Sequence, residues 1–367
     1  MWLLACASEP ALPIETGLDS WIVWDPPTLS LGRLHQPGDG GFVRTRDGLP
    51  IQQFRALGPE GVQAFTLDED FQQLDSARLT PEGEDDGDPA LTWDQDAIYQ
   101  AAPKAGGERA VLRKFDADFD LLASVDFALD QDERFLDESI TVDQGRVHLV
   151  SEHREAGETW VDNQPPSDEH LRGLHVRVFD TDLGAIEEHD LTAQLPGASP
   201  ENQFWGLGSS QIWTEDGYLV FAQQSVGDEV TWPEGESRGG RAVFALLFDQ
   251  DGLPMRTWGP LSPAGQDAYW PTGSLAQDGF LYVSYTFRRP EDGPVNGPPD
   301  PDQGNLALLV LDRDLQPVDR LVLTDLSSEQ LAAHGGAHRS HLEAFEGGLW
   351  VSYDQDGRAW AQEVLLD

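Results

Sequence analysis

The sequence predicts an all-β fold built from repeated four-stranded units, because three observations agree. A phrase made of an apolar run, a short Asp-rich turn and a second apolar run recurs five times along the 367 residues. A different strand-turn-strand phrase precedes most of these copies. Helical periodicity is nearly absent, and only Ser328 to His334 has the composition of a short helical turn. Repetition at this length indicates a closed array of like units.

The first phrase is marked by the aspartate that opens its turn. These aspartates are separated by 48, 64, 69 and 63 residues, and they are Asp68, Asp116, Asp180, Asp249 and Asp312. Two copies of Asp-Gln-Asp-Gly, at 249–252 and 354–357, begin like a calcium-binding loop but lack its later oxygen ligands. Aspartate also favours hairpin turns by bonding its own backbone. We therefore interpret these motifs as turns.

The second phrase is a short apolar strand, a turn with glycine, and a longer strand rich in aromatic and β-branched residues. Glycine adopts a positive φ at little cost, which suits a tight hairpin. The turn glycines are Gly145, Gly217, Gly279 and Gly347. Each unit thus reads as four consecutive strands.

Four-stranded units repeated around an axis predict a β-propeller rather than a two-sheet sandwich. Six blades are favoured, and the alternative is seven if residues 20–60 form a unit of their own. The last unit lacks outer strands, whereas the stretch from Ser20 resembles an orphan outer pair. We expect the N-terminal strands to complete the last blade and close the ring, which removes exposed sheet edges. Residues 20–367 are then one domain.

The charge balance limits the kinds of partner. The chain has 66 acidic and 23 basic residues and a formal net charge of −43, and Lys104 and Lys114 are its two lysines. Such a charge argues against binding nucleic acid or an anionic membrane surface. It fits simple solubility, a high-salt environment or weak cation binding, among which the sequence does not decide. We expect a monomer.

The single cysteine lies near the start of the chain, so an internal disulfide is excluded. Leu3-Leu4-Ala5-Cys6 resembles the lipobox of bacterial lipoproteins, although only five residues precede Cys6. The resemblance implies a truncated signal and tether over residues 1–19, a lipid on Cys6, and export to the bacterial cell envelope, facing the periplasm or the surface. The membrane would then be contacted only through this anchor.

We expect function on the face that carries the long connections, such as Gln224–Arg241, because long loops on a rigid scaffold usually form binding sites. Aromatic, cationic and acidic residues occur there in the links just before the innermost strands. Such groups can stack on and hydrogen-bond a glycan or another small molecule. The candidate ligand-binding residues are Arg134, Asp137, Trp205, Tyr269, Trp270, His334, His338, Arg339 and His341.

The three histidines within 334–341 could ligate zinc or copper. A loop fixes no ligand geometry and the HExxH motif is missing, so loop histidines with structural partners are the preferred interpretation. The sequence identifies no metal site, and it leaves the question of a cofactor open.

The repeats resemble bacterial exported lipoproteins with propeller folds, loosely of the TolB and sialidase types. The pair Asp251-Gly252 with Trp258 is similar to an Asp box, but the spacing to the tryptophan differs. Without a catalytic motif, the prediction is an envelope-anchored binding protein for a glycan, a small molecule or a protein. The first alternative is a glycan-active enzyme, and the second is a structural scaffold. The carboxylates to inspect for an enzyme are Asp137, Glu138, Asp267 and Glu343.

Overall fold

A computed structural model of the chain shows an almost entirely stranded fold. The structure describes residues 22–24, 42–46, 49–55, 62–67, 73–82, 84, 86, 89–94, 97–104, 109–128, 133–155, 172–191, 204–214, 217–231, 237–263, 266–289, 304–327, 329–331, 336–345, 347–355 and 358–366. Within these ranges the only helical residues are 329–331, inside the segment predicted to make one short turn. No helix in the described ranges has the length and apolar character needed to cross a bilayer.

The first half of the described chain contributes three groups of four strands. These are β2 (Phe42–Arg46), β3 (Leu49–Arg55), β4 (Val62–Leu67) and β5 (Gln73–Arg78); β6 (Ala90–Trp93), β7 (Ile98–Pro103), β8 (Arg109–Phe115) and β9 (Leu121–Ala128); and β10 (Glu133–Asp143), β11 (Arg146–Glu155), β12 (Arg172–Asp180) and β13 (Ala185–Asp190). Within each group, consecutive strands pair in an antiparallel manner.

The second half repeats this pattern. Its strands are β14 (Phe204–Thr214), β15 (Gly217–Thr231), β16 (Ser237–Phe248) and β17 (Pro254–Trp258); β18 (Asp267–Leu275), β19 (Leu281–Arg288), β20 (Asn305–Leu311) and β21 (Pro317–Val322); and β22 (His338–Phe345), β23 (Gly348–Gln355) and β24 (Arg358–Leu365). The predicted loop at Gln224–Arg241 is shorter than expected, since β15 continues to Thr231 and β16 begins at Ser237.

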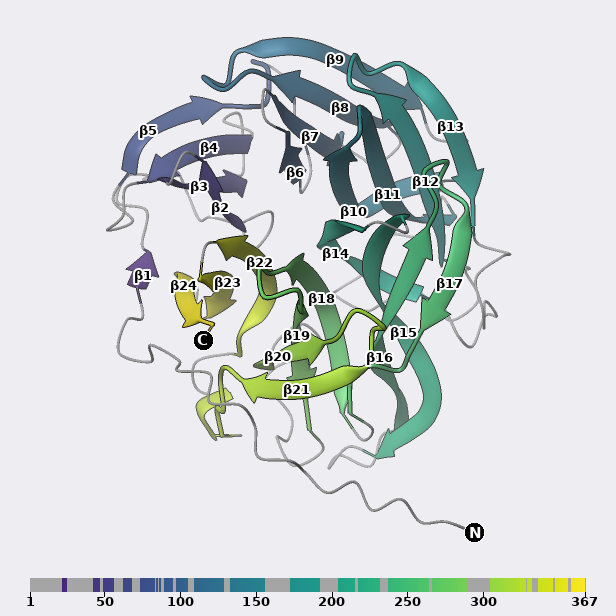
Figure 1. The fold of residues 1–367 in the computed structure, drawn as a ribbon, viewed down its shortest axis with the longest axis vertical. Coiled ribbons are helices and arrows are strands. Elements are labelled where there is room, and N and C mark those ends of the chain that lie inside the picture. Colours follow the sequence, from purple (N-terminus) through teal and green to yellow (C-terminus); the bar gives the residue numbers. More distant parts are fainter. Residues whose placement is uncertain are drawn as a thin grey trace.

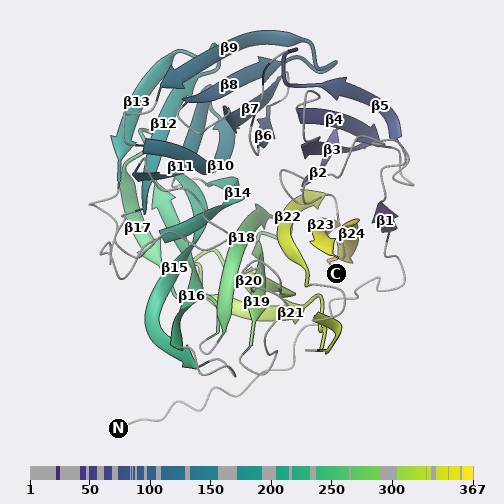
Figure 2. The ribbon, with the colours of Figure 1, turned by 180° about the vertical axis from the view of Figure 1, so that it is seen from behind.

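The groups are arranged as a propeller around a central axis (Figures 1 and 2). The first strand of each group lies toward the centre and the fourth lies at the periphery, as β6, β10, β14 and β18 show against β9, β13, β17 and β21. The strand β1 (Ile22–Trp24) pairs with β24, so an N-terminal strand completes the C-terminal sheet, as predicted. The all-β propeller fold is confirmed.

The count of six or seven separate blades is not confirmed. The described strands form four sheets of four strands and one sheet of eight strands, from β13 inward to β10 and from β14 outward to β17. One parallel pair, between Ile140 and Ser210, joins the innermost strands β10 and β14. No pattern in the sequence indicated this pair, because it joins residues of two different repeats.

The hydrophobic core lies between neighbouring groups and not within them. The two faces of one sheet supply two clusters: Phe221 and Val243 pack toward β18–β21, whereas Val220 and Leu246 pack toward β10–β13. Strands buried on both faces need apolar residues at nearly every position. This explains the unbroken apolar runs in the sequence.

The predicted turns are confirmed wherever the structure describes them. In four turns, Oδ1 of the first aspartate accepts backbone N–H groups two and four residues later at 2.8–2.9 Å, which explains the aspartate at Asp116, Asp180, Asp249 and Asp312. The carboxylate at Asp249 thus serves its own backbone, as the turn interpretation requires; residues 356–357 of the second motif, and Asp68, lie outside the described residues. The four predicted turn glycines all have positive φ.

A second repeated device escaped the sequence analysis. After the outermost strand of four groups, the backbone N–H of a buried leucine donates to a backbone carbonyl of the third strand, and the residue after the leucine is a threonine or serine. The Thr80 hydroxyl accepts the Val62 N–H at 2.8 Å, and the Thr324 hydroxyl does the same for Leu306 at 2.8 Å.

Candidate functional site

The innermost strands of four consecutive groups are interrupted at a similar level by β-bulges. The register shifts between Phe135 and Glu138 in β10, between Tyr269 and Thr272 in β18, and between His338 and His341 in β22. In β14 the pairing breaks twice, between Trp205 and Gln211. Bulges redirect side chains and concentrate near functional sites. These four bulges define the candidate site, which we call the axial bulge site.

Eight of the nine predicted ligand-binding residues belong to these bulged strands. The sequence analysis put them in links before the strands, but Arg134 and Asp137 lie in β10, and Trp205 lies in β14. The bulges explain the error, because an interrupted alternation no longer looks like a strand. The other members within strands are Tyr269, Trp270, His338, Arg339 and His341. Cys6 and His334 lie outside the described residues.

Trp270 is the most unusual residue of the axial bulge site. Its φ is 53°, in the left-handed region that bulky side chains rarely adopt. Its backbone N–H donates to Oε1 of Gln223 at 2.7 Å, and its side chain is partly exposed. A strained backbone persists where surrounding contacts hold it and often marks a functional site. Trp270 therefore presents an aromatic ring from a conformation fixed by a neighbouring strand.

The bulge of β22 is held by buried hydroxyl groups. The Thr272 hydroxyl donates to the backbone carbonyl of Ser340 at 3.0 Å, and the Ser340 hydroxyl donates to Ser284 Oγ at 2.9 Å. Thr272 and Ser284 are themselves 2.8 Å apart. Since all three side chains are buried, these bonds fix the backbone on which Arg339 stands.

Tyr269 lies beneath the site and not on its surface. The ring is fully buried, and the guanidinium of Arg241 stacks over it at 4.1 Å from the centroid. The Arg241 guanidinium also donates two hydrogen bonds to Asp267, from Nε at 2.8 Å and from Nη2 at 2.7 Å. The expectation of an exposed Tyr269 is corrected by this packing, which turns the ring toward Arg241. We assign Tyr269 a supporting position.

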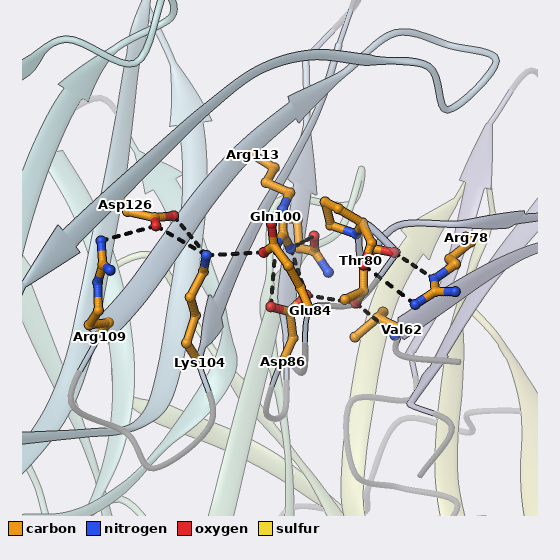
Figure 3. Close-up of polar contacts among 11 residues, drawn as sticks. Val62, Arg78, Thr80, Glu84, Asp86, Gln100, Lys104, Arg109, Arg113 and Asp126 are labelled. Carbon is orange, nitrogen blue, oxygen red and sulfur yellow. Dashed lines mark hydrogen bonds and ion pairs between the residues drawn. The ribbon is translucent and has the colours of Figure 1, made fainter. Parts of the chain in front are cut away.

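A larger polar network, at the junction of β2–β5 with β6–β9, was missed by the sequence analysis (Figure 3). Arg113 is completely buried and reaches Asp86 through Nη1 at 2.6 Å and through Nη2 at 3.2 Å. The Thr80 hydroxyl donates to the same carboxylate at 2.6 Å. Asp86 and Arg113 are 27 residues apart, so sequence spacing gave no signal for this pair.

The outer part of the network is more exposed. Lys104 lies 3.0 Å from Glu84 and 3.1 Å from Asp126, and Arg109 also reaches Asp126 at 3.1 Å. Partial burial disfavours the Lys104 cation, but hydrogen bonds and attraction from Glu84 and Asp126 outweigh it, so the pKa of Lys104 lies above its ordinary value. The charged side chains of the network pair with one another, so we interpret the network as structural.

His148 is a buried titratable group at the junction of β10–β13 with β14–β17. Its ring lies 4.3 Å from the ring of Tyr218, and the side chain has no exposed surface. Burial, with a smaller contribution from Arg146, lowers the pKa of His148 to about 4, although Asp249 and Asp251 oppose the change. The folded protein therefore holds this imidazole neutral.

We expect His148→Phe to reduce the loss of stability in acid. The unfolded chain takes up a proton at His148 below about pH 6.5 whereas the folded chain resists until about pH 4, so stability falls across this window. By pH 5 the wild type should lose about 2 kcal/mol relative to the variant. Urea unfolding of both proteins at pH 7, 6 and 5 measures this difference, and parallel pH curves would contradict it.

In the part of the chain that the structure describes, no three His, Cys, Asp or Glu side chains gather around one point. His341 is partly exposed in β22, opposite Ser352 of β23.

Two solved structures resemble the fold of this chain. The chain is similar to a protein of unknown function from Dyadobacter fermentans DSM 18053, with a TM-score of 0.59 and 11% identity, over 89% of this chain and 94% of the other. It is also similar to a subtype N10 neuraminidase-like protein of A/little yellow-shouldered bat/Guatemala, with a TM-score of 0.52 and 8% identity, over 94% and 98%. At these identities the likeness concerns the fold. No protein-family model and no curated protein matches the sequence.

Proposed function

We propose that the chain is a binding protein that holds a glycan at the axial bulge site. The observation that supports this most is the recurrence of a bulge at a similar level of β10, β14, β18 and β22. Three of these bulges contain or adjoin Asp137, Trp270 and Arg339, which are an acid, an aromatic and a cation. A binding site typically combines apolar surface with a few convergent polar groups, and sugars offer both an apolar ring face and hydroxyl groups.

Binding is favoured over hydrolysis by the state of one predicted carboxylate. Glycoside hydrolysis needs two carboxyl groups about 5–10 Å apart, one of which donates a proton. Both oxygens of Asp267 are engaged by the Arg241 guanidinium, and the pair is largely buried. Asp267 is therefore not free to act as the acid. Of the four carboxylates singled out in the sequence, Asp137, Glu138 and Glu343 stay candidates for an enzyme.

The remaining features of the proposal concern place and ring size. We propose that residues 1–19 tether the domain of residues 20–367 to the bacterial envelope through a lipid on Cys6, which intact-mass measurement of protein extracted from membranes would check. We also propose that the eight-stranded sheet acts as two blades, so that the ring has six. The support is that strand pairing joins its halves β10–β13 and β14–β17 at the single pair Ile140–Ser210, whereas their other contacts are between side chains packed face to face.

We expect Trp270→Ala to abolish the thermal stabilisation that a bound glycan gives. A ligand at a hundred times its dissociation constant adds about 2.7 kcal/mol, which a melting curve detects. The screen would use neutral hexasaccharides of glucose, xylose and mannose, because a chain with a net charge of −43 repels polyanionic glycans.

The matched control is Trp258→Ala, because Trp258 lies on the outer strand β17 and packs against the core away from the axis. This control should melt at a lower temperature but retain the ligand-induced shift. Loss of the shift in both variants, or its persistence in Trp270→Ala, would contradict the proposed site. A lack of any shift in the wild type would argue against a neutral glycan and favour a structural scaffold or a protein ligand.

A further inference from the structure

The conformation of Trp270 is set by a residue of the preceding strand group. Gln223 lies on β15 and is almost completely buried, and its Oε1 accepts the Trp270 N–H at 2.7 Å. Trp270 cannot form a regular ladder bond there, because the pairing of β18 with β19 is interrupted between Tyr269 and Thr272. The side-chain carbonyl of Gln223 therefore replaces the backbone acceptor that a regular strand pairing would offer to the Trp270 N–H.

The next bulge is held in the same way, from the group before it. Thr272 and Ser284 belong to β18 and β19, and both bond to Ser340 of β22. Thr272 directly follows the Trp270 bulge, so the contacts run from Gln223 through the bulge of β18 to the bulge of β22. The bulges of β18 and β22 are thus fixed by side chains that lie beneath the site and are themselves buried.

We propose that Gln223 is a positioning residue for Trp270, and that the Thr272–Ser284 pair has the same role for Arg339. This inference rests on the proposed function of the axial bulge site. A buried amide acceptor is well suited to the task, because an unpaired backbone N–H in a buried strand is costly and the bond cannot be replaced by water without opening the interface. Ligand affinity should then depend on residues that never touch the ligand.

The test compares Gln223→Met, which keeps the side-chain length but removes the acceptor, with Gln223→Glu, which keeps an acceptor oxygen. Backbone amide exchange at Trp270, measured by mass spectrometry or NMR, reads the bond without any ligand. We expect exchange to accelerate at least tenfold in Gln223→Met and to stay near the wild-type rate in Gln223→Glu. Titration with the neutral hexasaccharides above should show about a tenfold loss of affinity in Gln223→Met only.

The outcomes separate this inference from the proposed function. Unchanged exchange at Trp270 in Gln223→Met would overturn the inference, as would faster exchange with undiminished hexasaccharide affinity. Faster exchange in a protein whose wild type binds none of the hexasaccharides would leave the positioning of Trp270 in place and reject the glycan site. If Gln223→Met fails to fold, Ser284→Ala tests the second contact through amide exchange at Arg339 and Ser340, where the same acceleration is expected and an unchanged rate would contradict the proposal.

Discussion

Replacing Arg113 by methionine should lower the free energy of unfolding by about 3–5 kcal/mol. The substitution keeps the length of the side chain but leaves the Asp86 carboxylate buried without its guanidinium partner. Asp86 has no exposed side-chain surface, and Thr80 would be the main remaining donor near it. Chemical denaturation at pH 7 gives the free energy directly.

The same substitution elsewhere on β8 provides the control. Arg109 pairs with Asp126, but 57% of its side chain is exposed, so Arg109→Met should cost less than about 1 kcal/mol. A double variant, Arg113→Met with Asp86→Leu, should recover part of the lost free energy of unfolding, because no buried charge is then left without its partner. Equal losses in the free energy of unfolding for Arg113→Met and Arg109→Met would show that burial does not determine how much each ion pair contributes to stability.

Gly273→Ala is expected to destabilise the protein by about 3 kcal/mol through overpacking. A Cβ at this position would clash with ring atom Cε2 of Phe221 and would lie 3.1 Å from Cδ1 of Ile212. The Phe221 ring is completely buried, so it has little room to move away. The backbone of β18 can approach its neighbour this closely because residue 273 lacks a side chain. Thermal and urea unfolding would measure the effect.

A second substitution separates steric crowding from backbone strain. Combining Gly273→Ala with Phe221→Leu removes ring atoms near the new methyl group, so the double variant should lose less stability than the sum of the single losses. Gly145 has a φ of 80° and no atom within 4 Å of a built Cβ, so Gly145→Ala should cost about 1 kcal/mol by strain alone. The stability losses of Gly145→Ala and Phe221→Leu should be additive in the double variant.

The repeated part of the fold was predictable because local chemistry determines it. The Asp180 carboxylate accepts two backbone N–H groups of its own turn, and Gly279 adopts the positive φ expected of a turn glycine. Neither feature depends on distant parts of the fold. The closure of the ring through β1 and β24 also followed from counting strands. Each of these features depends on a few neighbouring residues or on the repeat itself.

The site was predictable only in composition. Trp270 and Arg339 were identified as candidates, but their bulges were not, since a bulge depends on which residue of the next strand stays unpaired. Tyr269 was expected on the rim but is buried. The error arose because a shift of one residue in register decides whether a strand side chain faces the core, and the sequence does not show the register. The Arg113–Asp86 pair joins two strand groups, so no local pattern announced it.

The most direct test of the axial bulge site is a crystal structure of the protein with the neutral hexasaccharide that stabilises it most. The account predicts sugar density against the indole of Trp270, bounded by the bulged segments of β10, β18 and β22. Density on the outer strands or beside the Asp turns, with Trp270 uncovered, would contradict it.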